Sequence, residues 1–160
     1  IAHGNRERAK LDWETTKITR DGLFYQNSEY KIEALATAHA GLRNFNYRIT
    51  TADKIIVITS DSEPDPRLVD FCRGADIMLV ECSGTKTFYD SVAFGGWHLT
   101  PEDVGALARD AGVKRTVLKH FVMESFTEDP DCAEKMAETV RSIHPEGEVH
   151  AAQDGMRFDL

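Results

Sequence analysis

The sequence has few cysteines and no long apolar run, and each of these absences excludes a class of protein. Its three cysteines, Cys72, Cys82 and Cys132, show no C-x-x-C spacing, so neither a disulfide framework nor a cysteine zinc site is predicted. No apolar run approaches the roughly 20 residues of a membrane-spanning helix, and the first residues lack a signal-peptide core. We therefore expect a protein with no membrane partner in a reducing, cytoplasmic setting.

Positive charge is also scarce. The chain has 19 Lys and Arg residues against 27 Asp and Glu residues, which gives a formal net charge of -8. This balance disfavours broad electrostatic capture of nucleic acid, although a local basic patch would still permit it, so nucleic acid is a possible but not favoured partner. The length of 160 residues and the apolar content of 41% predict about one globular domain with a sizeable core.

Short apolar runs alternate with helical patterns along the chain, which predicts a layered α/β fold. Strands are expected at residues 30–38, 45–50, 54–60, 76–81 and 114–121, with a closing hairpin over 148–160 around Asp154 and Gly155. Helices are expected at residues 66–74, 99–113 and 129–144. The stretch Ser83 to Trp97 is expected to be a long functional or substrate-facing loop.

Four of the predicted strands end in a titratable side chain: His39, Asp61, Glu81 and His120. Loops converge at strand ends in layered α/β structures, so these groups could meet at one rim of the sheet. Histidine and aspartate without a thiolate cluster suit zinc, with manganese or iron as other candidates. This long-range pattern indicates a metal site but does not define one by itself.

A family resemblance is carried by the order of "IIVITSDSEP", "ADIMLVEC" and "WHLTPEDVGALARDAGVKRTVLKHF". From residue 22 to residue 160 the chain resembles the second half of the metallo-β-lactamase-fold hydrolases, in the branch with ribonuclease Z, arylsulfatase-like and phosphodiesterase-like members. The resemblance implies an α/β fold, the αββα sandwich of two β-sheets with helices on both outer faces. It also implies one or two metal ions at the sheet edge, here two zinc ions, with manganese or iron as alternatives.

The resemblance assigns a role to five residues. His39 resembles the third histidine ligand of the first metal, Asp61 the carboxylate that bridges both metals, and His120 the last ligand of the second metal. His98 resembles the histidine that contacts the scissile phosphate and assists proton transfer. Glu81 matches the acidic residue that fixes the orientation of a ligand. A bridging role would also explain why a carboxylate follows a strand that looks buried, since an isolated buried charge is costly.

The chain departs from the family pattern in several places. The H-x-H-x-D-H motif, which supplies most of the remaining ligands, is absent from the sequence. We therefore expect residues 1–160 to be a single domain or the C-terminal half of a metallo-β-lactamase-fold domain, paired with an N-terminal half, a partner chain or a second copy; loss of the site is the alternative. Ser60, Ser62 and Lys119 stand where the family usually has glycine, threonine and threonine.

The function that the resemblance implies is metal-dependent hydrolysis of a phosphodiester or another small anionic ester by a zinc-activated water. The alternative is a non-catalytic binding or scaffold domain that kept the fold without a complete metal site. Each residue also has an ordinary reading: Asp61 could form a turn, His98 could precede a helix cap, and backbone donors could satisfy Glu81. His144 and His150 are expected at the surface.

Overall fold

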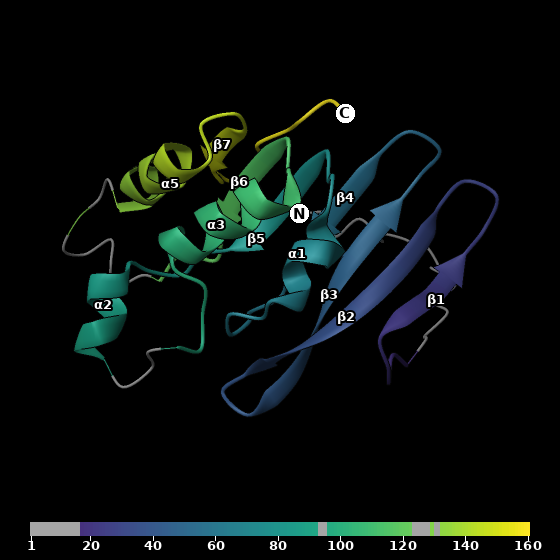
Figure 1. Cartoon of the computed structure of the whole chain (residues 1–160), viewed down its shortest axis with the longest axis horizontal. Helices are drawn as coiled ribbons and strands as arrows, with labels where there is room; N and C mark the ends of the chain where they lie inside the picture. The colour runs from purple at the N-terminus through teal and green to yellow at the C-terminus, as the bar shows by residue number, and fades with distance from the viewer. Residues whose placement is uncertain (1–16, 93–95, 123–128, 130–131) are drawn as a thin grey trace, which may run out of the picture.

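In the computed structural model, which describes residues 17–92, 96–122, 129 and 132–160, the chain builds one seven-stranded sheet. The strands follow one another across the sheet in chain order (Figure 1). They are β1 (Gly22–Gln26), β2 (Lys31–His39), β3 (Leu42–Thr50), β4 (Ile55–Ile58), β5 (Ile77–Glu81), β6 (Arg115–Lys119) and β7 (Glu148–Ala151).

Strand direction divides the sheet into two parts. From β1 to β4 the neighbouring strands are antiparallel, and from β4 to β7 they are parallel. Parallel neighbours need a crossover connection, and a helix lies in each one. These helices are α1 (Arg67–Cys72), α3 (Pro101–Ala111) and α5 (Cys132–Ile143), and the short α2 (Lys86–Ser91) precedes α3.

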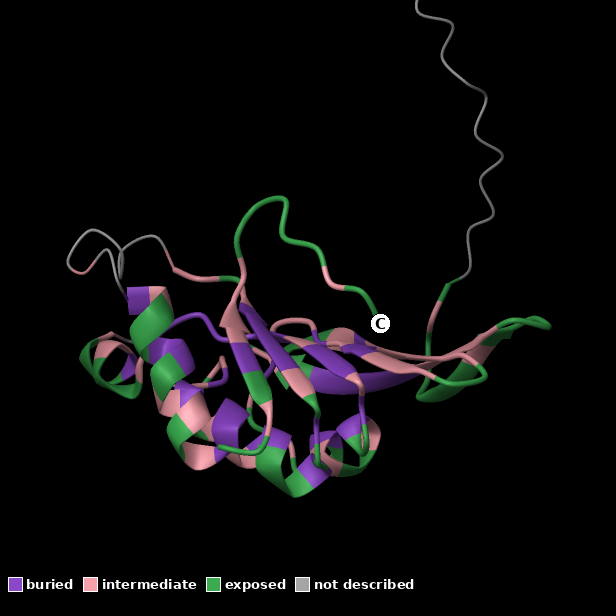
Figure 2. Cartoon of the chain, turned by 90° about the horizontal axis from the view of Figure 1, so that it is seen from above, coloured by how far each residue is buried: buried purple, intermediate pink, exposed green. Residues whose placement is uncertain are grey.

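The crossover helices cover one face of the sheet, as the view along the sheet shows (Figure 2). The main core lies between the sheet and these helices, because alternate residues of each strand point toward the helices. Val57, Met78 and Leu118 from the sheet pack there with Val104 of α3 and Met136 of α5, and all five are at most 1% exposed. The described residues therefore form one sheet and one helix layer, which are two of the four layers of an αββα arrangement.

Helix α3 begins and ends where its sequence predicts. Thr100 accepts a hydrogen bond from the Asp103 amide, the Asp103 carboxylate accepts one from the Thr100 amide, and Pro101 occupies the first turn. Gly112 ends the helix with a φ of 63°, a left-handed conformation that glycine adopts without a steric cost. This capped start holds the preceding residues of the chain in place.

The expected elements are confirmed except at the C-terminus. The closing hairpin is wrong: β7 pairs only with β6 among the described strands, and the chain after Ala151 forms a turn at Gln153–Met156 with no second strand. Strand β1 was not predicted, and helix α2 lies within the stretch that was expected to be a loop. His144 is not a surface residue, since it is 6% exposed and its Nε2 lies 2.8 Å from the Val113 carbonyl oxygen. None of the described helices has the length and apolarity needed to cross a membrane.

Candidate metal centre

Three side chains gather at one edge of the sheet: Asp61, His98 and His120. Each offers one potential ligand atom, and these three atoms all lie within 4.8 Å of one another. Asp61 follows β4, His120 follows β6 directly, and His98 lies two residues before the cap of α3. Two imidazoles and one carboxylate are a donor set that suits zinc.

The strand directions explain why these residues meet. The strands β4, β5 and β6 are parallel, so their carboxyl ends reach the same edge and bring Asp61, Glu81 and His120 together there. Strand β2 is separated from β4 by two antiparallel steps, so it runs in the same direction as β4. The last residue of β2, His39, therefore reaches this edge as well.

Glu81 is fully buried and fixes two segments of the site. Its Oε1 accepts hydrogen bonds from the amides of Ser62 (3.1 Å) and Leu99 (3.0 Å), the neighbours of Asp61 and His98 respectively. Its Oε2 lies 3.4 Å from His98 Nδ1. One carboxylate thus positions the backbone on both sides of the cluster, which is what a residue that orients ligands must do.

Ser83, which the sequence analysis did not single out, connects the polar groups of the site. Its hydroxyl donates to Glu81 Oε2 (2.9 Å) and lies 3.0 Å from His98 Nδ1 and 3.2 Å from His120 Nδ1. His120 Nδ1 is also 3.2 Å from Asp61 Oδ1. A hydroxyl can donate one hydrogen bond and accept two, so Ser83 can serve all three neighbours. Its place two residues after the end of β5 is the signal that could have found it.

His120 has a left-handed backbone with a φ of 65°. This conformation is uncommon outside glycine and persists where the surroundings enforce it. Here the Cys82 amide donates to the Lys119 carbonyl (3.0 Å) and the Val122 amide donates to the Ser83 carbonyl (2.8 Å), which ties both sides of His120 to the chain after β5. The backbone therefore directs the His120 side chain into the cluster.

The electrostatic environment favours a proton on His98. The hydrogen bond to Glu81 is the main cause that raises the pKa of His98, and the negative charges of Glu81 and Asp61 add to it. A proton on Nδ1 faces Glu81, which leaves Nε2 for a metal ion or a substrate. The His98 side chain is 15% exposed, whereas those of Asp61 and His120 are 33% and 48% exposed, so the cluster is open to solvent on one side.

The turn that carries Asp61 uses serine where the family usually has glycine and threonine. The Ser60 hydroxyl donates to the Phe45 carbonyl (2.6 Å), and its amide donates to Asn46 Oδ1 (3.0 Å). On the other side, the Ser62 amide donates to Glu81. Both neighbours of Asp61 are thereby anchored, so these substitutions leave the carboxylate in a fixed position.

His39 lies beside the cluster but outside the group of three. Its Nδ1 is 2.9 Å from the Trp97 carbonyl oxygen, and its ring centroid is 4.6 Å from that of His98. The structure thus brings Asp61 and His120 together as expected, with His98 as the third member. The roles of His39, Asp61 and His120 as ligands and of His98 and Glu81 as catalytic groups stay predictions.

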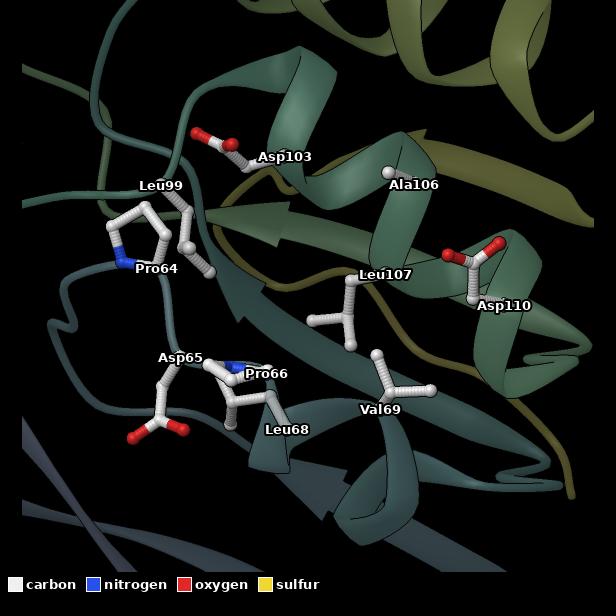
Figure 3. A pocket seen from close by; sticks show the side chains of 10 residues that line it. All are labelled: Pro64, Asp65, Pro66, Leu68, Val69, Leu99, Asp103, Ala106, Leu107 and Asp110. Atoms are coloured by element: carbon white, nitrogen blue, oxygen red, sulfur yellow. The ribbon is translucent and has the colours of Figure 1, made fainter.

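Cavities lie both at this edge and away from it. One of about 450 Å³ adjoins the cluster and is lined by His39 and His98. Another, of about 220 Å³, lies on the helical face between α1 and α3 (Figure 3). The carboxylates of Asp65 and Asp103 in that second cavity are already engaged, with Arg67 and with the Thr100 cap. The second cavity therefore offers fewer free polar groups than the cluster does.

Comparison with known proteins gives relatives of one kind. No family model matches the chain. The chain is 30% identical over 117 residues to ribonuclease Z of Kineococcus radiotolerans. This aligned region covers 71% of this chain and 36% of that protein. It is also 27% identical over 152 residues to the probable metallo-hydrolase YhfI of Bacillus subtilis. This second aligned region covers 91% of this chain and 57% of that protein. The chain thus spans about a third to just over a half of the length of these relatives.

Solved structures agree with the sequence relatives. The crystal structure of YhfI, described as a metallo-β-lactamase-fold protein, superposes with a TM-score of 0.70 at 22% identity and covers 87% of this chain and 53% of that one. The Zn²⁺-bound PqqB of Methylobacterium extorquens superposes with a TM-score of 0.62 at 16% identity, over 89% of this chain and 55% of that one. The sheet order and these similarities show that the chain has the metallo-β-lactamase fold.

Proposed function

We propose that the protein containing this chain is a metal-dependent hydrolase of phosphodiesters. The observation that carries the proposal is the cluster of Asp61, His98 and His120, whose potential ligand atoms lie within 4.8 Å of one another at the edge of the sheet. The similarity to a ribonuclease and to a probable metallo-hydrolase supports the same reaction class.

The described residues fit a metal ion. Asp61 and His120 offer a carboxylate and an imidazole, and Glu81 behind them is a second negative charge held by four polar neighbours. We infer that Asp61 and His120 hold metal, and that His39 adds a ligand as the family resemblance implies. Zinc is the ion we favour, with two ions at the centre and manganese or iron as alternatives. Bound there, the metal supplies Lewis-acid polarisation of the ester and an activated water.

The chain's own residues have distinct tasks in this proposal. Glu81 holds His98 in one orientation and favours its protonated form, as the raised pKa of His98 indicates. A protonated His98 can give a proton to the leaving oxygen of the ester. A general acid is efficient when its pKa lies near the pH at which the enzyme works. Ser83 keeps His98 and His120 at a fixed separation through one hydroxyl.

Composition and relatives favour different substrates within the phosphodiester class. The net charge of -8 disfavours broad binding of nucleic acid, whereas several relatives are named ribonuclease Z. We infer that RNA is the first substrate to test, since an RNA backbone is itself a phosphodiester. A small anionic ester is the alternative, and it needs no extended basic surface.

The test combines metal analysis with turnover. The full-length protein, purified and analysed for zinc, manganese and iron, should hydrolyse bis(p-nitrophenyl) phosphate, lose activity after chelation and recover it when metal is restored. An unstructured RNA oligonucleotide and a small cyclic phosphodiester, assayed in parallel, separate the two substrate classes. A stable folded protein that holds no metal and hydrolyses none of these would support the non-catalytic binding or scaffold domain instead.

A further inference from the structure

The cavity of about 450 Å³ beside the metal cluster has an aromatic and apolar lining. His39 and His98 form its wall on the side of the cluster, and the rest comes from outside the proposed metal ligands: Ala40, Phe88, Tyr89, Val92, Trp97 and Val122. Such a combination, an apolar cavity with a few polar groups at one end, is typical of sites for small organic groups.

The rings of this cavity are arranged in order from the cluster outward. The Tyr89 ring is stacked on the His98 ring, with centroids 5.9 Å apart and an interplanar angle of 11°. The Phe88 ring meets Tyr89 edge to face, at 5.5 Å and 67°. A histidine that belongs to the metal cluster is therefore continuous with an aromatic wall supplied by α2.

Tyr89 supports this wall from inside the fold. The residue is 5% exposed and its hydroxyl is fully buried, where the Ser83 side chain acts against the rise in the Tyr89 pKa that burial causes. Phe88 is only half-buried, so its ring keeps a surface that a ligand can contact.

Gly84 gives the aromatic wall its position. A Cβ atom at Gly84 would lie 2.9 Å from Phe88 Cδ1 and 3.5 Å from Tyr89 Cζ. The first distance is too short for a real contact, so any larger residue would displace the Phe88 ring. Gly84, the residue after Ser83, thus allows the Phe88 ring of α2 to approach the segment that follows β5.

We propose that this cavity binds a planar unsaturated ring carried by the substrate, a nucleobase or an aryl group, while the phosphate lies at Asp61, His98 and His120. The inference rests on the proposed function for the position of the phosphate. The ring stacks against the Phe88 ring, which the buried Tyr89 ring supports edge to face. Stacking is tolerant of ring identity because every aromatic ring has a π face.

The test uses two matched pairs of phosphate monoesters and the metal-loaded full-length protein, with binding measured by calorimetry. Phenyl phosphate and cyclohexyl phosphate differ in the planarity of a six-membered ring. Adenosine 5′-monophosphate and ribose 5-phosphate differ only in the base. We expect the planar member of at least one pair to bind roughly 5- to 160-fold more tightly, the range of a single stacking contact. The pair that shows the preference identifies the source of the ring.

Substitutions then locate the preference. Phe88→Ala should reduce it to about threefold or less while cyclohexyl phosphate and ribose 5-phosphate keep their affinities, and Phe88→Leu, which preserves apolar volume, should give the same result. Thr87→Ala, at an exposed position of the same helix, is the control and should change nothing. Equal binding within both pairs, or a preference that both Phe88 variants retain, would overturn the ring site but leave the hydrolase proposal intact. Failure of all four phosphates to bind would overturn the ring site and the position of the phosphate, whereas turnover of bis(p-nitrophenyl) phosphate decides the hydrolase proposal separately.

Discussion

The fully buried Glu81 makes a stability prediction that needs no bound metal. Replacing it with alanine leaves the amides of Ser62 and Leu99 without an acceptor, in segments that are 0% and 2% exposed. Each buried donor left unpaired costs about 1–3 kcal/mol. Glu81→Ala should therefore lower the free energy of unfolding by roughly 2–6 kcal/mol, provided that solvent does not enter the space left by the side chain.

Glu81→Gln is the matched variant. Its carbonyl oxygen can still accept from both amides, and its new amide group can donate to Ser83 Oγ or His98 Nδ1. The change exchanges charge-assisted hydrogen bonds of about 1.5–3 kcal/mol for neutral ones of about 0.5–1.5 kcal/mol, but it also removes a buried charge, so the two effects partly cancel. We expect a loss of less than about 2 kcal/mol.

The assay is urea unfolding followed by far-UV circular dichroism in the presence of a chelator, on the full-length protein. Glu138→Ala, at an exposed position of α5, is the control and should stay within about 0.5 kcal/mol of the unmodified protein. If Glu81→Ala were as stable as the control, or if Glu81→Gln lost as much as Glu81→Ala, then Glu81 would not act as the acceptor that holds the two segments.

Three further predictions concern the same fold and site. In the complete enzyme, Asp61→Ala should release at least one metal ion and abolish turnover. His98→Ala should keep the metal and lower the rate about 10²- to 10⁴-fold. Loss of metal from His98→Ala, measured by elemental analysis, would make His98 a ligand. Because Glu81 raises the pKa of His98, activity that needs protonated His98 falls as pH rises through that raised pKa, and Glu81→Gln should move this fall to lower pH; an unchanged pH–rate profile would contradict the acid role. Gly105→Ala should lower the urea midpoint, because the new Cβ would lie 2.8 Å from Ile143 Cβ. The overpacking cost of about 1–3 kcal/mol exceeds the roughly 1 kcal/mol of helix propensity gained. A higher midpoint would show that α3 and α5 can separate.

The sheet and its edge could be predicted because the signals are local. Asp61, Glu81 and His120 each follow an apolar run of strand type, and parallel strands deliver their carboxyl ends to one edge. The capping pattern of Thr100, Pro101 and Asp103 likewise marks the start of α3 without tertiary information. Patterns of this kind occur in any fold that contains the element, so the sequence alone is enough to predict where these strands and this helix lie.

The closing hairpin failed for the opposite reason. Asp154 and Gly155 are turn residues, and they do lie in a turn, but a turn makes a hairpin only if a second strand finds a partner. The C-terminal segment instead contacts the sheet through Phe158, whose ring lies against His150 and under the Arg115 guanidinium. Side-chain packing has taken the place of strand pairing there, and no local pattern reports it.

The order of the histidines at the edge depends on segments far apart in the sequence. The His98 ring lies near those of both His39 and His120, with centroids 4.6 Å and 5.7 Å away. His39 and His120 end strands, so topology alone brings them to the edge, but His98 arrives from the connection before α3 and is held there by Glu81 and Ser83. Both Glu81 contacts on that side, to His98 and to the amide of Leu99, join residues 17 and 18 positions apart. A sequence can identify the histidines, but the place of His98 in the cluster depends on its long-range contacts with Glu81 and Ser83.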